Sequence, residues 1–182
     1  MRTIGAEQPN LADLLAPWHD FYVVTGTAGA TLVGLLFVAA TLGSGVFTEE
    51  RRPHFRAFVS PSVAHFSSAL ALSLAALAPL HRWLLLAVIE GGVALFGLAY
   101  STIVWGAMIR LGITTTLDLE DRIWYGALPA LTYALVVATA IALWAERAAG
   151  LPVLPCGVGL LLLVGIRNAW DITSWTITRR RG

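Results

Sequence analysis

The most regular feature of the sequence is the alternation of long apolar stretches with short polar ones. Each apolar stretch has about 20 residues or more, the length that an α-helix needs to cross the hydrocarbon layer of a membrane. Lipid offers no partners to backbone N–H and C=O groups, so such stretches fold as helices. A transmembrane barrel is excluded, because its strands have about 10 residues and alternate in polarity. The expected helices cover residues 21–43, 57–80, 83–109, 123–145 and 152–176.

The composition leaves room for this bundle and little else. Of the 182 residues, 57% are hydrophobic and 13% are charged, whereas soluble domains carry roughly 25% charged residues. We therefore expect an all-α integral membrane protein, a bundle of five transmembrane helices that forms a single domain over residues 1–182. The net charge of +1 argues against a nucleic-acid binder, because the basic residues are dispersed at helix ends rather than gathered in one stripe. The expected partners are the lipid bilayer, further copies of the chain and a larger membrane complex.

The arginines predict how the bundle is oriented. All basic residues are Arg, and positively charged loops are retained in the cytoplasm. The pattern predicts an external N-terminus and a cytoplasmic C-terminus, in the cytoplasmic (inner) membrane of a bacterium. The fifth stretch contains charged residues, so a re-entrant segment is the alternative there. Five spans place Arg51, Arg52, Arg56, Arg110, Arg122, Arg179, Arg180 and Arg181 on one side, and Arg2, Arg82 and Arg147 on the other.

Small residues recur at four-residue spacing in the first helix. Gly26, Ala30 and Gly34 form a stripe that allows another helix to approach closely. Packing within the bundle is one interpretation. The other is that the stripe lines a narrow pore or makes a contact between copies of the chain.

Ionisable residues within the spans are the candidate functional residues. His65 lies about 12 Å from the inner boundary by the helical rise, and Arg167, Asn168 and Asp171 lie at a similar depth. Arg167 and Asp171 are four residues apart and can pair on one helix face. The three side chains of His, Arg and Asp could relay protons or bind an anionic group. The alternatives are a structural histidine and an arginine that extends to lipid phosphates.

Glu90 is the remaining candidate and lies about 10 Å from the outer edge of the third helix. It shares a face with Ala94, Gly97 and Ser101, a small polar stripe that could face the bundle interior. A neutral, hydrogen-bonded carboxyl group is the structural alternative.

Several chemistries find no support in the sequence. A haem with two histidine ligands is disfavoured, because only His65 lies within a span. The sequence contains no HExxH, Walker or GxSxG motif, and the single Cys156 excludes a site with several thiolates. We expect no metal, no cofactor and no identifiable catalytic residue.

Three segments resemble those of a group of small bacterial integral membrane proteins with no assigned function. They are WHDFYVVTGTAGATLVGLLFVAATL (18–42), FVSPSVAHF (58–66) and RNAWD (167–171). The resemblance implies a membrane location, a shared helical fold and a common signature that includes His65, Arg167, Asn168 and Asp171.

The leading functional hypothesis is a small channel or transporter of unknown substrate, formed by several copies of the chain. The second is an accessory or assembly subunit of a larger membrane complex that transports nothing. The third is an intramembrane enzyme that acts on lipid, although enzyme function is the less favoured class.

Overall fold

The computed structural model describes residues 10–44, 52–80, 82–110, 112 and 119–178. Every regular element in this part of the chain is helical, so the predicted all-α fold is confirmed. The elements are α1 (Leu11–Leu15), η1 (Ala16–Trp18), α2 (His19–Ser44), α3 (Arg52–Leu77), α4 (Trp83–Arg110), α5 (Leu119–Arg122), η4 (Ile123–Ala127), α6 (Leu128–Trp144), η5 (Ala148–Gly150) and α7 (Leu154–Thr178).

Four helical segments are long and apolar enough to cross a membrane. They are Leu11–Thr41, Trp83–Arg110, Leu119–Trp144 and Ala148–Asp171. The remaining long helix, α3, has 26 residues, and its described apolar part is Pro61–Leu77. The chain is thus a multi-pass membrane protein with four or five spanning helices. The fifth predicted stretch forms one continuous helix, α7.

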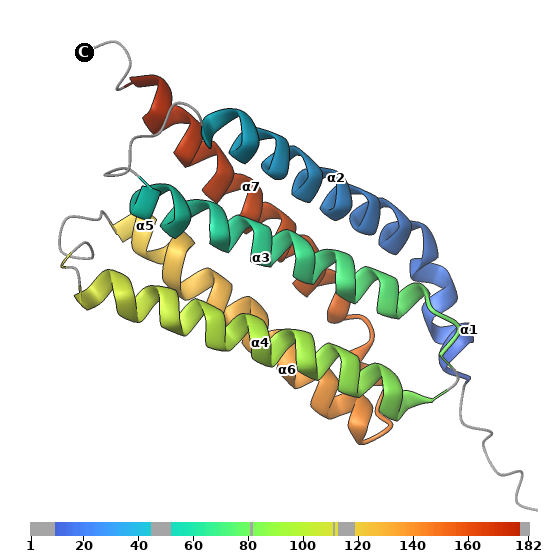
Figure 1. Cartoon of the computed structure of the whole chain (residues 1–182). Coiled ribbons are helices and arrows are strands. Elements are labelled where there is room, and N and C mark those ends of the chain that lie inside the picture. The colour runs from blue at the N-terminus through green and yellow to red at the C-terminus, as the bar shows by residue number, and fades with distance from the viewer. Residues whose placement is uncertain (1–9, 45–51, 81, 111, 113–118, 179–182) are drawn as a thin grey trace, which may run out of the picture.

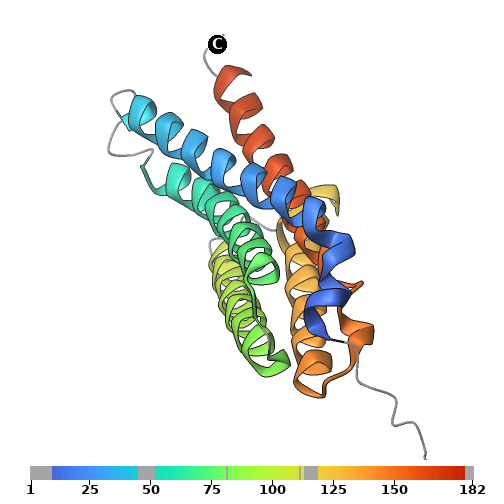
Figure 2. The same cartoon turned by 90° about the vertical axis from the view of Figure 1, so that its right-hand side faces the viewer.

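The long helices form a bundle in which α3 makes the most extensive contacts. It packs against α2, α4 and α7, while α4 packs along α6 and α6 packs against α7. The start of α2 and the end of α7 lie at opposite ends of the bundle (Figure 1). In the second view, α2 and α7 diverge toward the end of the bundle where α7 finishes (Figure 2).

The long helices α2, α4, α6 and α7 expose large apolar side chains on the outside of the bundle. Val24 of α2, Phe96 of α4 and Ile141 of α6 are each about two-thirds exposed, at 67%, 66% and 64%. Soluble monomers rarely expose continuous apolar surface of this extent. These side chains are therefore the lipid-facing surface.

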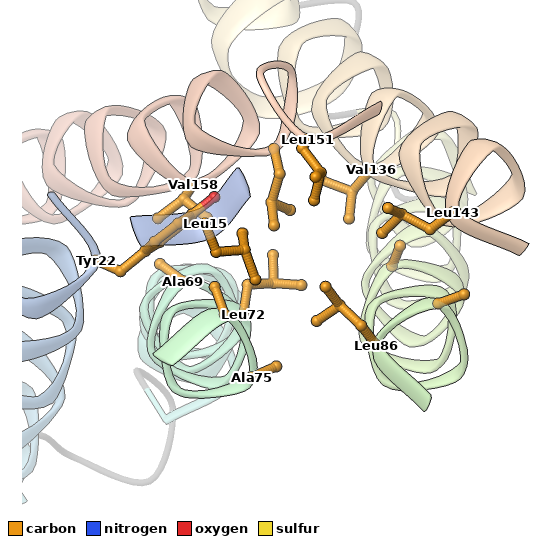
Figure 3. Close-up of a cluster of buried hydrophobic side chains, with 14 of the residues drawn as sticks. Leu15, Tyr22, Ala69, Leu72, Ala75, Leu86, Val136, Leu143, Leu151 and Val158 are labelled. Atoms are coloured by element: carbon orange, nitrogen blue, oxygen red, sulfur yellow. The ribbon is translucent and has the colours of Figure 1, made fainter. Parts of the chain in front are cut away.

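One end of the bundle is covered by the short helix α1. Asn10 caps it, since its Oδ1 accepts a hydrogen bond from the backbone N–H of Ala12 at 3.3 Å. Leu11 and Leu15 are buried in the main apolar cluster, and Leu15 lies at its centre with Leu72 and Leu86 close by (Figure 3). The lead-in to α2 thus closes the core at this end.

Glycines allow three aromatic side chains to fit between helices. A Cβ atom at Gly97 would collide with the ring of Tyr133, and one at Gly165 would collide with the ring of Phe66. A Cβ atom at Gly126 would lie only 2.8 Å from the ring of Trp105. Tyr133 and Phe66 are completely buried. These contacts set the distances between α4 and α6 and between α3 and α7.

Gly97→Ala should destabilise the protein by about 1–3 kcal/mol, because the added methyl group overpacks the core against Tyr133. Gly92→Ala in the same helix is the matched control, since a Cβ atom there meets nothing within 4 Å. It should keep or slightly raise stability, because Ala favours helix over Gly. Thermal unfolding of both variants in one detergent measures the difference. Equal midpoints would contradict the close α4–α6 contact.

Candidate functional site

The polar side chains of the bundle core follow the central helix α3. Ser62, His65, Ser68 and Ser73 are all buried, in a helix whose neighbours are mainly apolar. Buried polar groups in a low-dielectric interior need hydrogen-bond partners. The partners of the α3 groups come from α2 and α6. With the buried polar groups of α4 and α7 they form three clusters, named central, outer (toward the end that α1 covers) and inner (toward the opposite end).

The central cluster consists of His65, Tyr133 and Ser68. The hydroxyl of Tyr133 donates to Ser68 Oγ at 3.1 Å, and His65 Nδ1 lies 3.0 Å from the same hydroxyl. A phenol has one proton. Because Tyr133 donates it to Ser68, the short contact with His65 requires a proton on Nδ1. All three side chains are at most 4% exposed, so the cluster lies almost entirely inside the bundle, and Ser68 also lines a groove on its side.

The outer cluster surrounds Glu90, which is completely buried. Thr139 donates to Glu90 Oε2 at 3.2 Å. Glu90 Oε1 and the hydroxyl of Tyr22 have no hydrogen-bond partner among the described residues, and Tyr22 lies within electrostatic reach of Glu90. Tyr22 extends from α2 into the core next to Val158 (Figure 3). The outer cluster therefore has unused hydrogen-bonding capacity.

A second pair of hydroxyls links α2 to α3 near the same level. Thr25 Oγ1 and Ser73 Oγ lie 2.9 Å apart, and Thr25 also donates to the carbonyl of Phe21 at 2.9 Å. Gly26 makes this close approach possible. A Cβ atom built at Gly26 would lie only 3.2 Å from Ser73 Cβ.

The inner cluster lies where α7 meets the start of the α5–α6 segment. Arg167 pairs with Asp171 at 3.3 Å and with Glu120 at 3.0 Å. The hydroxyl of Tyr125 donates to Asp171 Oδ2 at 3.0 Å, and the Arg167 guanidinium lies 5.9 Å from the ring centroid of Trp124. Two acidic partners and an aromatic face satisfy most of the charge of Arg167.

Trp124 and Tyr125 are presented by the π-helical turn η4, and Pro129 explains why the turn forms there. In an α-helix the N–H of residue 129 would bond to the carbonyl of Tyr125, but proline has no N–H. The helix widens instead, and the N–H of Leu128 bonds to the carbonyl of Ile123. Such turns are frequent at functional sites.

Asn168 and Ser62 lie between the central and inner clusters. Asn168 is 1% exposed, yet both its amide atoms and the hydroxyl of Ser62 lack partners among the described residues. Gly165 of α7 packs against Phe66 of α3, and the two helices run in opposite directions. Asn168 lies three residues after Gly165, and Ser62 lies four residues before Phe66. The two polar residues therefore lie at a similar depth, on the faces where α3 and α7 meet. A buried amide without partners is costly. A water molecule or another small polar species would satisfy it.

The predicted site residues fall into separate clusters. Arg167 and Asp171 form the expected pair, and Asn168 lies one residue along the helix. His65 belongs instead to the central cluster, and Glu90 to the outer one. Residues that the sequence analysis did not single out complete the clusters: Tyr22, Glu120, Trp124, Tyr125, Thr139 and Tyr133. Tyr133 could have been found from its place in the middle of a span, far from the interfaces where tyrosine is common.

The small-residue stripe divides between two faces of α2. Gly26 is buried against Ser73, whereas Ala30 is exposed and Gly34 meets no atom within 4 Å. Gly29, which the sequence analysis did not single out, lies closer to α3 than Gly26 does. A Cβ atom built at Gly29 would lie 3.0 Å from the carbonyl oxygen of Phe66. Thr27 and Thr31 donate to carbonyls of their own helix. Self-association through Ala30 and Gly34 stays a prediction.

Comparison with known proteins adds no family to this description. The chain matches no protein-family model, and neither the curated proteins nor the solved structures give a match.

Asp171→Asn should lower thermal stability more than Glu120→Gln. Asp171 is mostly buried and also accepts from Tyr125, while the Glu120 side chain is 67% exposed. Asp171→Asn leaves Arg167 with the exposed Glu120 as its acidic partner, at a cost below the roughly 3 kcal/mol of a wholly unpaired arginine on insertion scales. Loss of an exposed ion pair costs less than about 1 kcal/mol. Unfolding midpoints of both variants in detergent test this. Equal midpoints would mean that Arg167 does not depend on Asp171.

Proposed function

We propose that this chain is a small membrane channel or transporter, and that the species it moves is the proton. The observation that carries the proposal is the succession of buried polar groups along α3. At about 1.5 Å per residue, Ser73, Ser68, His65 and Ser62 follow each other at intervals of about 8, 5 and 5 Å. Each of them has a polar neighbour from another helix or an unsatisfied group beside it.

The succession has acidic groups near both ends. Glu90 and the Tyr22 hydroxyl lie toward the outer end, and each has a polar atom without a partner among the described residues. Asp171 and Arg167 lie at the inner level, on either side of Asn168 along α7. Imidazole, hydroxyl and carboxyl groups can both accept and donate protons, and ionisable residues in spans mark proton relays in pumps and transporters. Along the helix axis, intervals of this size correspond to one or two bridging waters.

A proton fits this interior better than a metal ion or an anion does. Two grooves open sideways on the described part of the bundle, one between α3 and α4 and one between α4 and the α5–α6 segment. Neither is lined by Glu90, His65 or Arg167. An ion would need a wide hydrated path, whereas a proton can pass along a narrow line of hydrogen bonds.

Proton flux into liposomes that contain the purified protein tests the proposal directly. Flux driven by a membrane potential should fall to the level of protein-free liposomes in Glu90→Gln and in His65→Gln. The matched controls are Glu146→Gln and His19→Gln, whose side chains are exposed, and they should conduct like the wild type. Absence of wild-type flux under every gradient would remove transport as the function.

The membrane and the orientation belong to the same proposal. We infer a bacterial cytoplasmic membrane with the start of α2 outside and the end of α7 inside. The support is the arginine distribution together with the resemblance to small bacterial membrane proteins. Arg82 and Arg147 lie at the end of the bundle that α1 covers, and Arg110 and Arg122 lie at the other. Arg2, Arg51, Arg179, Arg180 and Arg181 lie outside the described residues.

Cysteine labelling tests the orientation. In a Cys156→Ser background, Ala149→Cys should react with an impermeant thiol reagent in intact cells, because residue 149 is exposed at the proposed outer end. Leu119→Cys, which is 73% exposed at the opposite end, should react only after the cells are opened. Both replaced residues are uncharged, so the arginine balance is unchanged. The reverse labelling pattern would invert the topology.

A second candidate function is an accessory subunit of a larger membrane complex, and one observation favours it. From Ala30 to Thr41, the α2 side chains are exposed or half-buried, and α2 diverges there from α7 (Figure 2). This face has small residues that suit another helix. The same liposome experiment separates the two functions, because an accessory subunit should show no flux alone and should co-purify with a membrane protein.

A further inference from the structure

The side of the bundle between α3 and α4 has a groove that shares Ser68, but neither Glu90 nor His65, with the proposed proton path. Its volume is about 630 Å³, within the roughly 300–1,000 Å³ typical of small-molecule sites. Its lining includes Ala64, Ser67, Ser68, Gly92, Phe96 and Tyr100. The exposed Leu95 and Phe96 beside it belong to the lipid-facing surface, so the groove opens into the membrane.

Small residues create the groove. Ala64 and Ala71 contribute only methyl groups from α3, and at Gly92 an ideal Cβ would meet nothing within 4 Å. Phe96 and Tyr100 form the other wall, and their rings stack at a centroid distance of 6.4 Å and an interplanar angle of 19°. A flat ring can lie against such a wall.

Two hydroxyl groups give the groove its polarity. Ser67 is exposed and lines it directly. Ser68 Oγ accepts a hydrogen bond from the hydroxyl of Tyr133. Its own O–H can therefore donate a hydrogen bond to another group. The groove therefore offers hydrogen-bond donors to a ligand that carries an acceptor.

The depth of these hydroxyls decides between lipid classes. Along α3, Ser68 lies about 18 Å from Arg56 and about 14 Å from Leu77 by the helical rise, close to the middle of a hydrocarbon layer about 30 Å thick. Phospholipid ester groups lie at the edges of that layer. A lipid that reaches Ser68 with a carbonyl group must have a polar ring small enough to enter the hydrocarbon.

We propose that the α3–α4 groove binds an isoprenoid quinone, with the ring against Phe96 and Tyr100 and a ring carbonyl accepting hydrogen bonds from Ser67 and Ser68. The apolar tail extends along the open side of the groove into the lipid. The proposal concerns binding alone and is independent of proton transport, although Ser68 connects the groove to the central cluster.

Photolabelling with an azido derivative of decylubiquinone, in liposomes that contain the full chain, tests the proposal. Label should appear on peptides of α3 and α4, and unlabelled decylubiquinone should compete with it at saturation. Gly92→Leu fills the groove and should abolish the specific label. Gly106→Leu is the matched control, because Gly106 lies in the same helix, outside this groove, and an ideal Cβ there also meets no atom within 4 Å. Its labelling should be unchanged.

Ser67→Ala keeps the groove open and removes one donor. It should weaken competition by unlabelled decylubiquinone about three- to tenfold, as expected for one hydrogen bond, at an unchanged unfolding temperature. Decylbenzene, which has the tail but no carbonyl, should compete poorly, and so should a diacylglycerol. Equal competition by decylbenzene or by diacylglycerol, or undiminished label in Gly92→Leu, would overturn the quinone assignment.

Discussion

The hydrocarbon layer of a membrane contains no hydrogen-bond partners, and the architecture of this chain depends on that constraint. Backbone groups are satisfied within helices, and the threonines on the surface of α2 turn their hydroxyls back to carbonyls of their own helix. Stronger polar groups cannot be satisfied in this way. Glu90 and His65 therefore lie in the bundle interior, while the large apolar side chains face outward. A soluble protein exposes mainly polar side chains, whereas this bundle exposes mainly large apolar ones.

Close helix packing is the means by which the interior polar groups find partners. Association of helices in lipid relies on packing and on interhelical hydrogen bonds. Gly97 admits the ring of Tyr133 between α4 and α6, and the same ring then supplies the hydroxyl that joins His65 to Ser68. A glycine in one helix thus determines the hydrogen bonding of a histidine in another. Packing and polarity are coupled at this point of the fold.

The groups that packing leaves unsatisfied are the ones most informative about function. Buried polar atoms without partners cost free energy, and native proteins retain few of them. Here they include the amide of Asn168, the hydroxyl of Ser62 and one oxygen of Glu90. The proposed proton relay requires groups that can form and break hydrogen bonds. A fully satisfied network would be more stable and less suited to transfer.

The sequence by itself indicated that the chain is all-helical and roughly where its long helices lie. Length and hydropathy are properties of single segments, and a rise of 1.5 Å per residue converts position into depth. The Arg167–Asp171 pair was predictable for the same reason, since its spacing lies within one helix. Only the tertiary structure decided which residues meet across helices. His65 pairs with Tyr133, 68 residues away, and Arg167 with Glu120, 47 residues away. Ala30 and Gly34 face outward although Gly26 packs inward. In lipid both faces of a helix are apolar, so the pattern does not fix the rotation of a helix about its axis, and the neighbouring helices do.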